Sequence, residues 1–163
     1  RLWAGPEFGL GFYRAGGVTV AFLFDAHRRG LADGVQLPPM RGRLLDADCF
    51  FGPDRAWLTL ELESAGKLTR RLVVVGRDGN VKASADSPAW LEGLHGACAS
   101  GPYLFVPTDR GIVRVDDTLS TVEYAETEPF VDGSSRLAAA AGGLRVANRR
   151  EVLKLEVKQE ARI

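Results

Sequence analysis

The sequence predicts an all-β protein, an antiparallel β-propeller or partial propeller with about four blades of short strands, formed as a single domain over residues 1–163. Three observations support this fold class. Short segments rich in β-branched and aromatic residues are bounded by Gly, Pro, Asp or Asn. A glycine-ended motif recurs between these segments, and the repeat length is about 40 residues.

Short alternating or apolar runs define the expected strands. They cover residues 18–25, 56–63, 71–76, 103–106, 111–116 and 151–157. The segment SSRLAAAA at 134–141 would favour a helix on composition alone, because alanine is the best helix former and a serine can cap it. The repeat places a strand there instead, so we expect this segment to be extended.

One motif marks an inner strand of each unit and the turn that follows it. Two copies read L-x-x-x-C-x-x-G, with Cys49 and Cys98 at the cysteine position. A third copy has Ala139 there, and a weaker fourth runs from Leu10 to Gly17. Small residues suit the crowded centre of a propeller, and the glycine provides a turn conformation that other residues reach at a cost.

Repeats of this length built from antiparallel strands are typical of propeller blades. One four-stranded sheet cannot bury both of its faces, whereas sheets stacked in series bury them against each other. In such a unit the TDRG turn at 108–111 joins the second strand to the third. The DGN turn at 78–80 joins the third strand to the fourth, at a position that needs positive φ.

The segment LFVPTDRGIVRVD resembles the hairpin of bacterial β-propellers, in which a hydrophobic strand, a Thr/Asp-x-Gly turn and an Ile/Leu-x-Arg-x-Asp strand follow one another. The resemblance covers residues 9–157. The stretches RLWAGPEFGLGFYRAGG and TEPFVDGSSRL are similar to propeller-like regions of uncharacterised bacterial proteins that carry von Willebrand A-type modules. This resemblance implies a scaffold and assigns no catalytic residue.

Four units leave two ways to complete a propeller: a compact four-bladed ring, or part of a larger ring with open edges. We expect residues 1–5 to add a strand to the last blade, or a homo-oligomer or a partner to cover the edges. The chain begins at Arg1 without a methionine, and we interpret it as a segment of a longer precursor. The expected partner is therefore another protein or the remainder of that precursor.

Charge and composition narrow the classes of partner. The 21 Lys and Arg residues balance the 21 Asp and Glu residues, so no bulk charge attracts nucleic acid or an anionic membrane. No apolar run approaches the length of about 18 residues that suggests a membrane span, and no signal peptide is recognised. We expect a cytoplasmic protein with two reduced, buried cysteines.

The metal-ligating and nucleophilic residue types form no complete site in the sequence. Cys49, His95 and Cys98 could share one zinc ion, but zinc requires about four donors and the pattern lacks the fourth. Cys98 with His95 or His27 as a base would need a lowered thiolate pKa in a cleft, which no feature indicates. A packing role for the cysteines is the favoured interpretation.

Two further patterns have simpler explanations. Asp46, Asp48 and Asp54 lack the remaining ligands of a calcium site, so solvated loop acids are favoured. The glycine-rich stretch GLGFYRAGG precedes a strand, whereas phosphate-binding loops precede a helix N-terminus. We expect no metal and no cofactor.

Two functional hypotheses follow. The first is a non-catalytic protein-interaction scaffold whose contacts are formed by Trp90 in one loop and by Phe130 with its neighbour Glu128 in another. The second is a ligand-binding or enzymatic propeller with a site in its axial channel, formed by Asp48, His95 and Arg136. The sequence favours the first hypothesis, because no acid–base or nucleophile set recurs at a plausible spacing.

Overall fold

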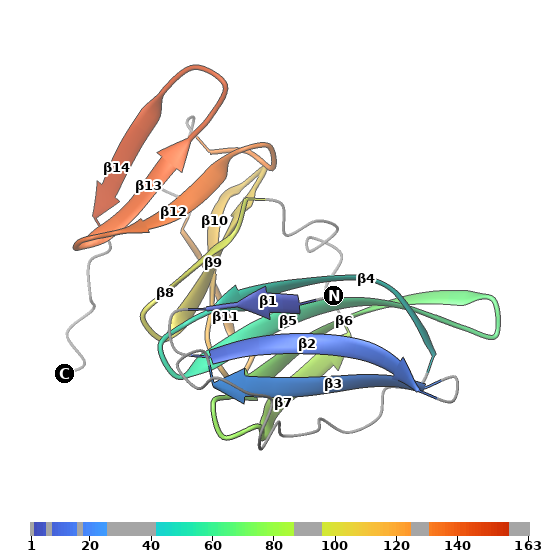
Figure 1. Cartoon of the computed structure of the whole chain (residues 1–163). Helices are drawn as coiled ribbons and strands as arrows, with labels where there is room; N and C mark the ends of the chain where they lie inside the picture. Colours follow the sequence, from blue (N-terminus) through green and yellow to red (C-terminus); the bar gives the residue numbers. More distant parts are fainter. Residues whose placement is uncertain are drawn as a thin grey trace.

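The computed structural model describes residues 2–5, 8–15, 18–25, 42–86, 96–124 and 131–156. The all-β prediction is confirmed: these residues form strands in four antiparallel sheets and contain no helix. Each sheet consists of strands that are consecutive in the chain (Figure 1). The sheets are therefore successive meanders: the second and third have the expected four strands, and the first and fourth have three described strands.

The strands have the following bounds. The first sheet contains β1 (Leu2–Ala4), β2 (Phe8–Ala15) and β3 (Val18–Asp25). The second contains β4 (Arg43–Phe51), β5 (Arg55–Ser64), β6 (Lys67–Gly76) and β7 (Val81–Asp86). The third contains β8 (Cys98–Ser100), β9 (Tyr103–Thr108), β10 (Gly111–Val115) and β11 (Thr121–Tyr124). The fourth contains β12 (Arg136–Ala140), β13 (Gly143–Ala147) and β14 (Val152–Glu156).

Local predictions from turn chemistry are confirmed. The TDRG turn joins β9 to β10, the second and third strands of their sheet, and the DGN turn joins β6 to β7, the third and fourth. Gly79 and Gly111 have φ values of 81° and 119°, a region that favours glycine. The alanine-rich segment forms strand β12, so the repeat predicted it correctly against its helical composition.

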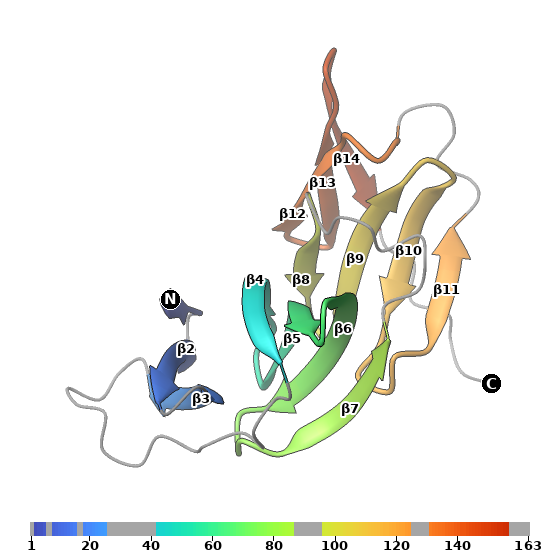
Figure 2. The same ribbon diagram turned by 90° about the vertical axis from the view of Figure 1, so that its right-hand side faces the viewer.

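The four sheets pack face to face in series as an open stack. The sheets β1–β3 and β12–β14 lie at opposite ends in both views (Figures 1 and 2), so the described residues do not close into a four-bladed ring. Residues 1–5 were expected to extend the last blade, and that prediction is wrong. Strand β1 pairs with β2 instead, because a hairpin closed by the Gly5 N–H on the Phe8 carbonyl (2.8 Å) costs less loop entropy than a distant pairing.

Three hydrophobic cores lie between the four sheets. The first core, between the first and second sheets, contains Phe8, Leu10, Phe12, Ala47, Ala56, Leu58, Leu60, Leu62 and Val75. The second core, between the second and third sheets, contains Trp57, Leu72, Val74, Leu104, Val106, Val113 and Val115. The third core, between the third and fourth sheets, contains Phe105, Ile112, Val131, Leu137, Leu144 and Val146. The two middle sheets therefore bury both faces.

Strand alternation explains how one strand contributes to two cores. Ile112 belongs to the third core and Val113 to the second, as expected for neighbours that point to opposite faces of a sheet. The same alternation shows that the two cysteines of the repeated motif do not face equivalent neighbours. Cys49 packs on the first core and Cys98 on the third, so the first faces the preceding sheet and the second the following sheet.

The weaker fourth copy of the motif is also placed differently. That copy begins at Leu10 in strand β2, which is the central strand of its sheet, between β1 and β3. The strands β4, β8 and β12 of the other copies are edge strands that pair with one neighbour each. Gly17 lies outside the described residues. The motif thus identifies the edge strands of three sheets and fails at the first.

Candidate interaction surfaces

Four of the residues proposed from the sequence as functional cannot be placed. Trp90, His95, Glu128 and Phe130 lie outside the described residues, so the two contact loops remain predictions. The other two proposed residues, Asp48 and Arg136, lie on first strands of different sheets.

Asp48 and Arg136 do not point toward a shared site. Ala47 and Cys49 pack toward the first sheet, so Asp48 between them points toward the third. Leu137 packs in the third core, so Arg136 before it points away from the stack. Arg136 is exposed, and its Nη1 donates to the carbonyl oxygens of Ser134 and Ser135 at 3.5 Å each.

The cysteines are free and half-buried, which is less burial than the sequence predicts. They lie in adjacent sheets, as predicted, and no disulfide joins them. Burial raises the pKa of the Cys98 thiol to about 11. Burial, together with the charge of Asp48, raises the pKa of the Cys49 thiol further. A thiol with a raised pKa holds little thiolate at neutral pH, which is the opposite of what a nucleophile needs.

We expect both thiols to react slowly with iodoacetamide at pH 8 in the folded protein, and both to react rapidly in denaturant. Because the folded state disfavours the thiolates, the unfolded chain loses its thiol protons first, near the ordinary pKa of 9.0. The stability that the neutral thiols provide is therefore complete below about pH 9 and is lost as the pH rises through about 11. Cys98→Ala should flatten this alkaline decrease in melting temperature. A thiol that reacts rapidly in the folded protein would contradict the assignment.

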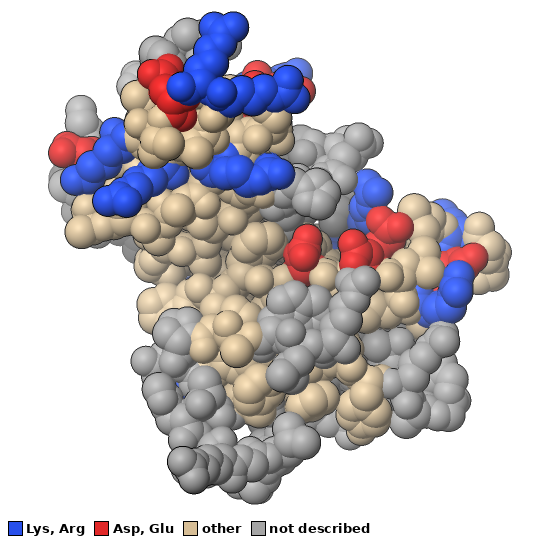
Figure 3. Space-filling model, turned by 45° about the horizontal axis from the view of Figure 1, so that its top comes forward, with Lys and Arg blue, Asp and Glu red and all other residues tan. Residues whose placement is uncertain are grey.

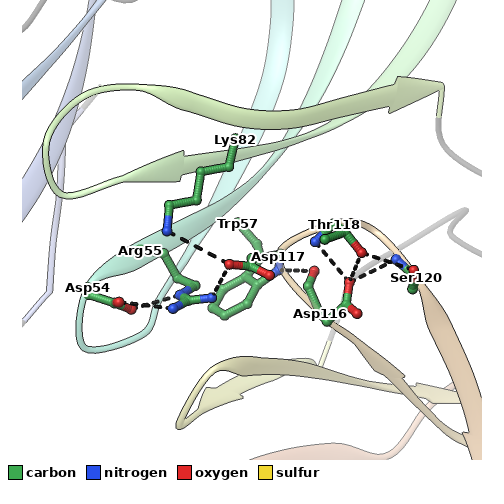
Figure 4. Close-up of polar contacts among 8 residues, drawn as sticks. All are labelled: Asp54, Arg55, Trp57, Lys82, Asp116, Asp117, Thr118 and Ser120. Carbon is green, nitrogen blue, oxygen red and sulfur yellow. Dashed lines mark hydrogen bonds and ion pairs between the residues drawn. The ribbon is translucent and has the colours of Figure 1, made fainter.

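A polar cluster joins the second sheet to the third (Figure 4). The Arg55 guanidinium, 13% exposed, donates to the Asp54 carboxylate at 2.7 and 2.9 Å and also to Asp117 across the sheet boundary. These hydrogen bonds raise the pKa of Arg55 and lower that of Asp54. Lys82 approaches Asp117 at 3.8 Å, and the Trp57 indole N–H donates to the Asp116 carbonyl at 3.2 Å. The cluster fixes the two sheets together.

Two hydrogen bonds donated by backbone N–H groups join the segment of the third sheet to that of the fourth. The Gly133 N–H donates to the Asp109 carboxylate at 2.9 Å, and the Leu137 N–H donates to the Gly96 carbonyl at 2.7 Å. The TDRG motif predicts a turn, but the sequence carries no signal that Asp109 of that turn reaches the next sheet.

Several acids have structural roles in turns. The Asp116 carboxylate accepts from the Thr118 N–H and hydroxyl and from the Ser120 N–H at 2.7 to 2.9 Å. The Asp132 carboxylate accepts from Ser134 in the same manner, which lowers the pKa of Asp132. Asp followed by Ser or Thr two residues later is a recognisable turn pattern, so the sequence did carry this signal. Across the described ranges, no three metal-ligating side chains form a group.

The outer face of the first sheet carries an aromatic surface. Phe22 and Phe24 are half-buried, and their rings lie over Gly11 and Gly9 of the neighbouring strand, where a Cβ would overlap them. Tyr13 continues the row with its ring 5.8 Å from that of Phe22, and 52% of Tyr13 is exposed. We call Gly9, Gly11, Tyr13, Phe22 and Phe24 the aromatic face.

The outer face of the last sheet is cationic with small apolar residues between its charges. Arg145 of β13 lies directly opposite Lys154 of β14, and both are exposed. Figure 3 shows Lys and Arg side chains gathered at this end of the molecule. Val152 is 68% exposed. We call Arg136, Ala138, Ala140, Arg145, Ala147, Val152, Lys154 and Glu156 the cationic face; three of these residues are cations and Glu156 is an acid.

Comparison with known proteins provides no relative. No family model matches the sequence, and no match was found among curated proteins or solved structures. Within the part of the chain that the structure describes, no helix is long and apolar enough to cross a membrane.

Proposed function

We propose that the four meanders are blades of a partial β-propeller, and that the protein is a non-catalytic scaffold that binds other protein through the open ends of its stack. The observation that carries the proposal is the pair of end faces against which no described residues pack a further sheet. Interior sheets of this fold bury both faces, whereas the aromatic and cationic faces have no described sheet against them. Tyr, Phe and Arg are enriched in contact surfaces. The two end faces present Tyr13 with half-buried Phe22 and Phe24 at one end and exposed Arg145 at the other.

The chemistry of the described residues also supports binding rather than turnover. The cysteines have raised pKa values, Asp54 is paired with Arg55, and Asp116 and Asp132 accept hydrogen bonds within their own turns. Groups used in this way stabilise the scaffold and are not free for acid–base work.

The test is to immobilise the domain and capture partners from the source cell. We expect one defined protein to be retained by the wild type and by Leu68→Glu, which alters an exposed residue of β6. Retention should be lost with Phe22→Glu or Arg145→Glu if the end faces bind. It should be lost with Trp90→Ala or Phe130→Ala if the proposed loops bind. Circular dichroism must show that each variant folds. A domain that retains no protein but converts a small molecule would refute the proposal.

A further inference from the structure

We propose that two copies of this chain associate head to tail, with the aromatic face of one copy packed on the cationic face of the other. The inference rests on the proposed function, because it names the partner of the two end faces. The aromatic face of one copy is thus covered by the fourth sheet (β12–β14) of a second copy of this chain.

The first argument is continuity. Within one copy the same packing mode occurs three times: a meander lays one face on the face of the next meander and buries apolar side chains between them. The series ends at the first and the last sheet of the described stack (Figure 2). A head-to-tail contact adds one more step of the same packing.

The second argument is complementarity of shape. The Phe22 and Phe24 rings lie over Gly11 and Gly9, so large side chains cover this part of the aromatic face. The facing surface on the last sheet places small residues around Arg145 of the central strand, with Ala138 directly opposite it on β12 and Ala147 two residues beyond it on β13. Large residues against small ones interdigitate, whereas two aromatic faces would bring large residues together.

The third argument is electrostatic. Arg145 and Lys154 are directly opposed like charges, an unfavourable cross-strand pair, and neither forms an ion pair with another described residue. An aromatic ring attracts a guanidinium or ammonium group placed over its face. The chain already uses this contact: the Arg114 guanidinium lies 4.6 Å from the centre of the Tyr103 ring. Two cationic faces would repel each other, so the contact joins unlike faces.

The experiment uses one variant for each face. Phe22→Glu places a carboxylate on the aromatic face, and Arg145→Glu reverses a charge on the cationic face. In sedimentation velocity over a concentration series, we expect the wild type to self-associate and each variant alone to do so at least about tenfold more weakly. An equal mixture of the two variants should associate again, because one copy supplies an intact cationic face and the other an intact aromatic face.

Two control variants introduce a glutamate at exposed positions outside the aromatic and cationic faces. Leu68→Glu changes an exposed apolar residue of β6, and Arg110→Glu reverses an exposed charge in the β9–β10 turn. Both should associate as the wild type does. If Phe22→Glu does not fold, Tyr13→Glu at the more exposed end of the same face replaces it.

Three results would overturn the inference: a wild type that stays monomeric throughout the series, an Arg145→Glu variant that associates normally, or a mixture that stays monomeric. An Arg145→Glu variant that associates normally, beside a wild type that associates, would indicate a contact that does not use the cationic face. A monomeric wild type that still captures a different protein, and loses it with Phe22→Glu, would refute the self-association and leave the proposed scaffold function intact. A monomer that captures nothing would refute both.

Discussion

Replacement of Trp57 by alanine is expected to lower the free energy of unfolding by about 3–5 kcal/mol. Trp57 is fully buried in the second core, between the second and third sheets, and its indole N–H donates to the Asp116 carbonyl of the neighbouring sheet. Alanine would leave a cavity at the boundary that the Arg55 cluster also spans and would remove the indole hydrogen bond, while the Asp116 carbonyl keeps its bond from the Leu119 N–H at 3.3 Å. Against a typical total of about 5–15 kcal/mol, this loss is large.

Chemical denaturation followed by circular dichroism measures the effect without relying on tryptophan fluorescence. Trp57→Phe keeps much of the buried surface and removes the N–H, so it should cost about 1–2 kcal/mol. Val81→Ala, at a residue that is 39% exposed, should change stability by less than about 0.5 kcal/mol. If Trp57→Ala cost no more than Val81→Ala, the second core would not hold the sheets together.

The strands and their hairpins were predictable because the signals for them are local. Turn residues at 78–80 and 108–111 determine where two hairpins reverse, and alternation places Ile112 and Val113 on opposite faces. Even the alanine-rich β12 was predictable once its spacing from the other units was known.

The sequence did not predict which neighbouring sheet each residue faces or whether the stack closes into a ring. Both depend on contacts with other sheets, which the local sequence pattern does not specify. Cys49 pairs with Leu58, which faces the first sheet, and Cys98 pairs with Phe105, which faces the fourth. A difference of one residue in register reverses the face, and the motif does not encode register. The open stack likewise depends on contacts between sheets far apart in the sequence.

The aromatic face was missed for a related reason. The segment 18–25 looks like an ordinary core strand, and its Phe22 and Phe24 were assigned no role. Only the position of the first sheet at the end of the stack leaves these rings without a described sheet against them. Residues on a strand cannot reveal from their own pattern whether one face or both faces will be covered.

Gly96→Ala is expected to destabilise the fold by at least about 4 kcal/mol, an exceptionally large loss for one methyl group. Gly96 has a φ of 93°, and a Cβ there would overlap the carbonyl oxygen of Ser135. Ser135 cannot retreat easily, because it is fully buried and its hydroxyl accepts from the Asp132 N–H at 3.1 Å. The methyl group would therefore break the bond from the Leu137 N–H to the Gly96 carbonyl, which joins the third sheet to the fourth.

The matched control is Gly66→Ala in the β5–β6 turn, where φ is 75° and a Cβ would have no atom within 4 Å. That variant isolates the backbone cost of positive φ, about 1–2 kcal/mol, so the difference between the two variants measures the overlap at the sheet boundary. Denaturation gives both free energies, and hydrogen exchange should show the Leu137 amide losing protection in Gly96→Ala alone. Equal costs for the two variants, with the Leu137 amide still protected, would mean that the close approach of the third and fourth sheets does not contribute to stability.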